Sequence, residues 1–316
     1  MPRSHHVLFM AAMLGMAGVA SAQAYPRKPV RRVTSEAGSG LDFTARVIAQ
    51  GLTASLGQQV IVDNRRILTV ELVAKAPPDG YTLLAYGSPM WIVPFLRNDI
   101  KYDPVKDFSP ITLVVTSPNV LVVHPRVAAK TVQELVALAK AKPGELNYGS
   151  SVTGGSPHLA AELFKSMAGV NLMRITYKGV ALAMNELVGG QIDLMFPVVA
   201  SGMPHVRAGR LRALAITSVQ PSALAPGLPT IAASGLPGYE LVAMFGILAP
   251  AKTPPAIIAR LNHETVQYIT QPEIRQKFLV SGSEVVASSP QQFAATIAID
   301  MARMGKLIRD QNIRDD

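Results

Sequence analysis

Short apolar, β-branched runs alternate along the chain with stretches whose apolar residues recur at helical spacing. The first unit consists of a strand-like run at Val30–Thr34, a turn of small residues, and a helical stripe over Leu41–Leu52 that ends at Gly57. Such strand–helix–strand units are typical of parallel sheets covered by helices on both faces. The pattern therefore predicts an α/β fold.

The same rhythm restarts past His124 and predicts a second α/β unit. Thr131 is a suitable N-cap for one helix, and Ser156 with Pro157 reads as the N-cap and first residue of another. The buried stripe of that second helix is predicted at Leu159, Leu163 and Met167, before Gly169. The other strands that we expect are Gln59–Val62, Tyr81–Ala85, Leu113–Val123, Leu146–Gly149, Met173–Tyr177, Gln191–Phe196, Leu211–Thr217 and Met244–Ala249. Two C-terminal helices follow, and the second begins near Ser289.

The length of 316 residues suits two domains better than one core. No flexible linker separates the two units, so we expect the chain to cross between lobes on strands, as in a hinge. The expected division is 25–123 with 247–316 for the first lobe and 124–246 for the second.

The N-terminal residues 1–24 read as a cleaved secretory signal. Arg3 supplies a positive charge, Val7–Ala20 is apolar and uncharged, and cleavage is expected after Ala22 or Ala24. The apolar stretch is too short to favour a membrane span. We therefore expect a protein exported to the periplasm.

Composition excludes several kinds of site. The chain has no cysteine, which rules out disulfides, thiolate metal sites and cysteine nucleophiles. The net charge of +9 comes from scattered lysines and arginines, without the aromatic interleaving of nucleic-acid grooves. The basic surface is either a solvated surface or a mild field that attracts anions. We expect no metal, no cofactor and no nucleic-acid partner.

The motifs of common enzyme classes are also missing. There is no Gly-x-Ser-x-Gly elbow and no phosphate loop, and Phe43 occupies the third glycine position of a dinucleotide fingerprint. Instead, two loops rich in glycine and serine each follow an expected strand and precede a helix, at 37–40 and 150–155. Backbone amides at such helix starts favour anions, and paired loops at the carboxyl ends of strands face a ligand cleft. This pattern favours binding of an anion without chemistry.

Several motifs across the chain resemble the Bug-type receptors, the TctC-like periplasmic solute-binding proteins of tripartite tricarboxylate transporters. The stretch Ala76–Leu83, which reads Ala-Pro-Pro-Asp-Gly-Tyr-Thr-Leu, is the most specific of them. The other motifs are Tyr25–Val30, Leu56–Gln58, Tyr102–Phe108, Leu146–Ser150, His158–Ala160, Tyr177–Gly179, Gly190–Phe196 and Leu236–Glu240.

The resemblance implies a periplasmic-binding-protein type II-like fold, with two doubly wound lobes joined by two crossing strands. It also implies a monomer that captures a small organic carboxylate and delivers it to membrane transporter subunits. The residues that it places at the ligand are Ala37, Gly38, Ser39, Asp42, Ser88, Ser150, Thr153, Gly154, Gly155, Ser156, His158, Tyr177, Lys178, Gly179 and Pro197.

The chain departs from the family pattern in three places. Glu36–Ser39 replaces a proline-glycine-glycine turn, a shorter segment at 66–72 replaces a glycine-rich loop beside the cleft, and Pro197 replaces an acidic residue. For Asp42 we favour a role within its own loop, because its charge would repel a ligand carboxylate. Lys178 either pairs with the ligand or is a solvated turn residue.

Two alternative functions are a receptor that signals to a sensor kinase and, with less support, an enzyme on a two-lobed scaffold. The ligand is left open among aliphatic dicarboxylates, amino acids and aromatic acids.

Overall fold

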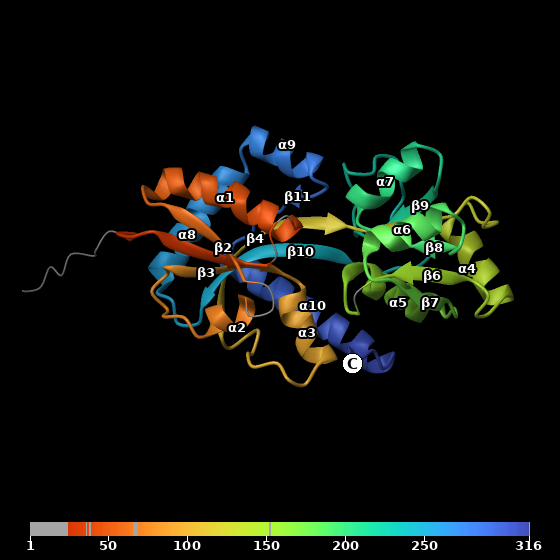
Figure 1. Ribbon diagram of the computed structural model, residues 1–316, viewed down its shortest axis with the longest axis horizontal. Coiled ribbons are helices and arrows are strands. Elements are labelled where there is room, and N and C mark those ends of the chain that lie inside the picture. The colour runs from red at the N-terminus through yellow and green to blue at the C-terminus, as the bar shows by residue number, and fades with distance from the viewer. Residues whose placement is uncertain (1–24, 36, 38, 66–68, 152, 316) are drawn as a thin grey trace, which may run out of the picture.

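The structure is a computed structural model that describes residues 25–35, 37, 39–65, 69–151 and 153–315. The predicted signal peptide at 1–24, Glu36, Gly38 and the segment 66–68 lie outside the described residues. The chain folds into two lobes side by side, each with its own sheet and helices on both faces (Figure 1). The predicted α/β class with two doubly wound lobes and two crossings is confirmed.

The sheet of the first lobe has six strands in the order β11-β4-β10-β3-β1-β2. Helices α1, α8 and α9 cover one face, and α2, α3 and α10 cover the other (Figure 1). The strands are β1 (Val30–Thr34), β2 (Val60–Asn64), β3 (Thr82–Gly87), β4 (Phe108–Pro118), β10 (Val242–Pro250) and β11 (Glu284–Val285). The helices are α1 (Gly40–Leu56), α2 (Thr69–Ala74), α3 (Pro89–Leu96), α8 (Pro255–Ile269), α9 (Pro272–Val280) and α10 (Pro290–Asp310).

The sheet of the second lobe has five strands in the order β7-β6-β8-β5-β9. Its strands are β5 (Val120–Val123), β6 (Asn147–Ser150), β7 (Met173–Thr176), β8 (Leu194–Met195) and β9 (Arg212–Ile216). Its helices are α4 (Val132–Ala141), α5 (Ser156–Ala168), α6 (Val180–Val188) and α7 (Val199–Arg207).

The chain crosses between the lobes twice, from β4 into β5 and from Leu241 into β10. One crossing leaves the first lobe and the other returns, so β10 runs antiparallel to β4. Both sheets are therefore mixed, because the expected parallel pairing does not extend to the crossing strands β5 and β10. The expected boundaries also fall too late, because β5 pairs with β8 and β9 of the second sheet and β10 begins at Val242.

Local sequence signals fix most helix ends. Ser289 caps α10 through a capping box with Gln292, as the Ser-Pro start predicts. The start of α5 differs from the prediction: Gly155 is the N-cap and Ser156 is the first helical residue. Met167, expected in the buried stripe of α5, is exposed. Thr69–Leu72, expected in a loop, begins α2.

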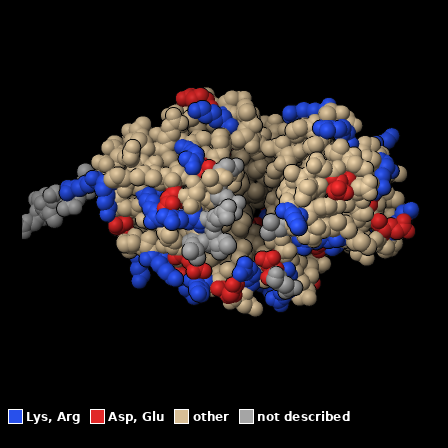
Figure 2. Space-filling view, viewed as in Figure 1, with Lys and Arg blue, Asp and Glu red and all other residues tan. Residues whose placement is uncertain are grey.

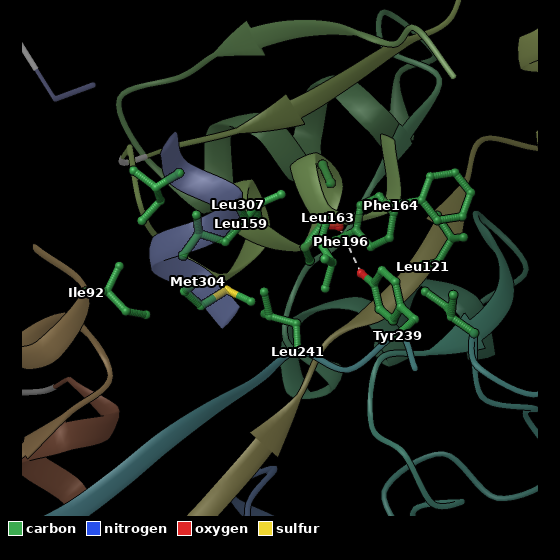
Figure 3. Close-up of a cluster of buried hydrophobic side chains, with 14 of the residues drawn as sticks. Ile92, Leu121, Leu159, Leu163, Phe164, Phe196, Tyr239, Leu241, Met304 and Leu307 are labelled. Carbon is green, nitrogen blue, oxygen red and sulfur yellow. Dashed lines mark hydrogen bonds between the residues drawn. The ribbon is translucent and has the colours of Figure 1, made fainter. Parts of the chain in front are cut away.

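The largest hydrophobic core is continuous across the hinge. Met304 and Leu307 of α10, in the first lobe, lie with Leu159 of α5 in the second (Figure 3). Tyr239, just before the second crossing, is fully buried and donates its hydroxyl to the carbonyl of Ala160 at 2.8 Å. Helices α10 and α5 thus pack together at the hinge region.

One core position of the first lobe carries a charge. Arg32 on β1 is fully buried, and its Nη1 donates to the carbonyl of Ala45 in α1 at 3.1 Å. Its Nε and Nη2 have no hydrogen-bond partner among the described residues. Burial lowers the pKa of the guanidinium to about 9. The lobe therefore tolerates a charge that is costly to bury without a partner.

Candidate functional site

A cavity of about 240 Å³ lies between the two lobes, beside β10. Leu41 and Ile92 line it from the first lobe, Leu159 and Val198 from the second, and Met244 from β10. Viewed from outside, the surface is hollowed where the two lobes meet (Figure 2). The walls are mainly apolar, so a molecule held here is removed from water over most of its surface.

Among the described helices, four begin beside this cavity. The starts of α1 and α3 border it from the first lobe, and those of α5 and α7 border it from the second. No side chain caps the starts of α3, α5 and α7. The first amides of a helix lack partners within that helix and carry the positive end of its dipole. Four such ends around one cavity favour an anionic group there.

An arginine braces the loop of the second lobe. Arg174 on β7 donates its Nε to the hydroxyl of Ser150 at 2.8 Å and Nη2 to the carbonyl of Ser151 at 3.2 Å. The same guanidinium reaches the hydroxyl of Thr153 at 3.4 Å. Because β7 lies parallel to β6, Arg174 stands beside Tyr148 and extends toward the loop. Sequence reasoning identified the loop but missed this residue.

His158 holds the same loop from the other side. Its Nδ1 accepts a hydrogen bond from the backbone N–H of Gly154 at 3.1 Å, which requires a neutral imidazole. The side chain is 3% exposed, and this burial, followed by the charge of Arg174, lowers its pKa to about 4. The two contacts keep residues 153–154 in place at neutral pH.

At Gly154 the second lobe lies close to α3 of the first lobe. Its φ is +75°, and a Cβ added there would stand 2.2 Å from Cδ1 of Leu96 in α3. The positive φ of the turn therefore favours glycine here, and a larger residue would also displace the end of the Leu96 side chain.

The loop of the first lobe is braced by an acid. Ser39 caps α1 by accepting from the N–H of Asp42 at 3.2 Å. The Asp42 carboxylate, 5% exposed, accepts from Nε of Arg46 at 3.0 Å and from Nδ2 of Asn64 at 2.9 Å. These contacts agree with the role within its own loop that we favoured for Asp42. Ala37 is exposed, and Gly38 lies outside the described residues.

Two expected serines connect the cavity to the crossing strands. Ser88 accepts from the N–H of Met244 at 3.1 Å and donates its own N–H to the Met244 carbonyl at 3.2 Å. Ser156 accepts from Nδ2 of Asn119 at 3.3 Å, and Asn119 is the buried residue between β4 and β5. Both serines line the cavity, as does Gly154.

The remaining expected residues lie outside this cavity lining. Tyr177 packs partly buried on the core below α6, and its N–H donates to the Ser150 carbonyl at 2.8 Å. Lys178 is exposed, and Gly179 is the N-cap of α6. The Pro197 carbonyl accepts from the N–H of Val120 at 2.8 Å. Their part in ligand binding stays a prediction.

Sequence reasoning also missed an acid in the cavity wall. Asp300 on α10 lines the cavity, is 5% exposed, and accepts from Nε1 of Trp91 at 2.8 Å. A sequence signal exists: Phe293, Ile297, Asp300 and Met304 share one helical face and are all buried. An acid within a buried stripe indicates a specific partner.

The described residues contain no group of three or more His, Cys, Asp or Glu side chains placed to hold a metal ion. None of the helices in the described ranges is both long and apolar enough to cross a membrane.

Comparisons with known proteins agree with this architecture. The sequence pattern of the "Tripartite tricarboxylate transporter family receptor" matches residues 44–313. BugT of Bordetella pertussis is 33% identical over 306 residues, which cover 95% of this chain and 94% of BugT.

Two solved structures that contain a ligand are similar to this chain over nearly their whole length. Rpa4515 of R. palustris, solved with adipate, is 32% identical with a TM-score of 0.76, and the match covers 92% of this chain and 99% of that one. MatC of Rhodopseudomonas palustris, solved with malate, is 26% identical with a TM-score of 0.73, covering 90% and 100%. The family and the fold are those of solute-binding proteins, and the predicted resemblance is confirmed. The chain belongs to the receptor family of the tripartite tricarboxylate transporters.

Proposed function

We propose that this protein captures a small organic carboxylate in the periplasm, as a monomer and without chemical change, and delivers it to a membrane transporter. The observation that carries the proposal is the cavity between the lobes, which is bordered by four helix starts. Neutral amides at these starts bind a carboxylate without a charged side chain in direct contact.

The relatives support the same ligand chemistry. Adipate and malate, the ligands of the two similar structures, are both carboxylates. The two crossings between the lobes, at β4–β5 and before β10, support closure of the lobes around the ligand about that hinge. Residues 1–24 serve as the export signal in this proposal, and the N-terminal residue of the exported protein, identified by mass spectrometry, checks the cleavage site.

Thermal unfolding of the purified mature protein against a panel of mono- and dicarboxylates tests the proposal. A ligand at 100 times its Kd should stabilise the folded protein by about 2.7 kcal/mol, which corresponds to a few degrees in Tm for a chain of this size. Amides of the same acids serve as uncharged controls. Equal stabilisation by acids and amides, or none by any acid, contradicts carboxylate capture.

A further inference from the structure

The described lining of the cavity carries charge of one sign. Among the described residues that line it, Asp300 is the one with an ionisable side chain. Its neighbours on the wall, such as Ile92, Leu159 and Met304, are apolar. The cavity therefore offers amide dipoles, apolar surface and one carboxylate, but no lining cation for a second anionic group.

Asp300 shares its cationic partner, Arg303, with a second carboxylate. Nη2 of Arg303 donates to Asp300 at 3.3 Å, while Nη1 of the same side chain donates to Glu240 at 2.9 Å. Two carboxylates thus share one guanidinium, and the other partner of Asp300 is the neutral indole of Trp91. This cluster adds a net negative charge behind the wall.

The positive and negative features lie at different depths. Ser88 and Ser156 mark the helix starts, whereas Ile92 and Leu159 lie three residues or more into the same helices, about 5 Å further along each axis. α10 packs against α3 and α5, and its Asp300 accepts a hydrogen bond from Trp91, which lies three residues past Ser88 in α3. A ligand whose carboxylate meets the helix starts therefore extends its body toward Asp300.

We infer that this receptor selects monocarboxylates with an apolar body and discriminates against dicarboxylates, because the inner end of its cavity carries the Asp300 carboxylate. This rests on the proposed function and names the ligand class of the same site. A second carboxylate at the inner end would lose its water and face a like charge in an apolar enclosure, which is unfavourable. An apolar or neutral end meets no such opposition.

The test compares acids in pairs of equal carbon skeleton: butanoate with succinate, hexanoate with adipate, and 4-methylbenzoate with terephthalate. Their Kd values for the purified mature protein are measured by isothermal titration calorimetry at pH 7.5. We expect the monocarboxylate of a binding pair to bind at least tenfold more tightly. A dicarboxylate that binds as tightly as its partner overturns the inference and leaves the receptor function intact. If no acid binds, carboxylate capture itself fails.

A variant links the selectivity to the residue. Asp300→Asn removes the charge and keeps an oxygen that can accept from Trp91. We expect it to reduce the ratio of the two Kd values by threefold or more, mainly through tighter binding of the dicarboxylate. This ratio is measured within one preparation, so partial loss of folded protein does not alter it. Asp310→Asn, on the same helix but exposed and paired with Lys306, is the matched control and should leave the ratio unchanged. An unchanged ratio in Asp300→Asn overturns the assignment to Asp300.

Discussion

The two loops that face the cavity are both rich in glycine and serine but are held by side chains of opposite charge. In the first lobe, the Asp42 carboxylate gathers Arg46 and Asn64 beneath the start of α1. In the second lobe, the Arg174 guanidinium gathers Ser150, Ser151 and Thr153 beside the start of α5. The charge around a loop of small residues at a helix start therefore depends on the side chains that hold the loop.

The difference indicates that the two loops contribute differently to stability and to ligand binding. The brace in the first lobe is anionic and nearly buried, so it stabilises the lobe and adds no attraction for an anion. The brace in the second lobe is cationic and partly exposed, so its field reaches a carboxylate at the start of α5. We expect changes in the first loop to alter mainly stability, and changes in the second to alter ligand affinity as well.

The largest expected effect is a loss of stability at low pH, where protonation of His158 breaks its contact with the second loop. The folded protein holds His158 with a pKa of about 4, below the ordinary 6.5. Between these values the unfolded chain takes up a proton that the native state does not, so stability falls as pH drops from 6.5 to 4. The loss from this group approaches about 3 kcal/mol. Urea unfolding measured from pH 7 to pH 4 follows it.

His158→Asn isolates this contribution, because asparagine supplies an acceptor near the position of Nδ1 and does not titrate. We expect a shallower fall in stability for this variant than for the unaltered protein over the same range. His263→Asn, at an exposed position of α8, should keep the original slope. Equal slopes for all three proteins would show that His158 does not contribute.

The next effect breaks the first loop. Asp42→Ala leaves Arg46 and Asn64 without their shared acceptor and removes the acid from the first turn of α1. We expect the free energy of unfolding to fall by about 2 kcal/mol, measured by urea unfolding. Glu273→Ala removes an exposed first-turn acid of α9 and should cost about 0.5 kcal/mol. A similar loss in both variants would mean that only the helix dipole matters.

The smallest of the three effects sharpens the difference in affinity. Arg174→Met removes the bonds to the second loop and its positive charge, and we expect carboxylate affinity to fall about tenfold, or 1.4 kcal/mol. Arg207→Met deletes an exposed arginine at the end of α7 and carries the same change in net charge. Calorimetry compares the two Kd values. An equal loss in both would assign the effect to net charge and not to the loop.

The sequence predicts those parts of the fold that depend on neighbours along the chain. The bounds of β1 match the predicted strand at Val30–Thr34, and α1 ends at Gly57, which adopts the left-handed conformation that glycine favours. The sequence does not predict which strands pair. The expected division gives β5 to the first lobe because the apolar runs on either side of the Thr116–Asn119 break read as one strand region. Only the partners of β5 in the second sheet place it in the second lobe.

The candidate site shows the same limit. Both loops could be found from small residues at helix starts, since that signal is local. The partners that decide their chemistry are distant: Asp300 lies 209 residues from Trp91, and Arg174 lies 24 residues from Ser150. Of the adjacent pair Arg31 and Arg32, one forms a surface ion pair with Asp63 and the other is buried, a contrast that the sequence does not reveal.

The topology of the crossings has a consequence for how receptors of this kind diversify. The second lobe is a single uninterrupted segment of chain, from β5 to the residue before β10, inserted between two strands of the first. Arg174 and its loop belong to that inserted segment, while Asp300 belongs to the first lobe. Recombination of one gene segment between relatives would therefore give a hybrid receptor with a new carboxylate anchor and an unchanged inner wall.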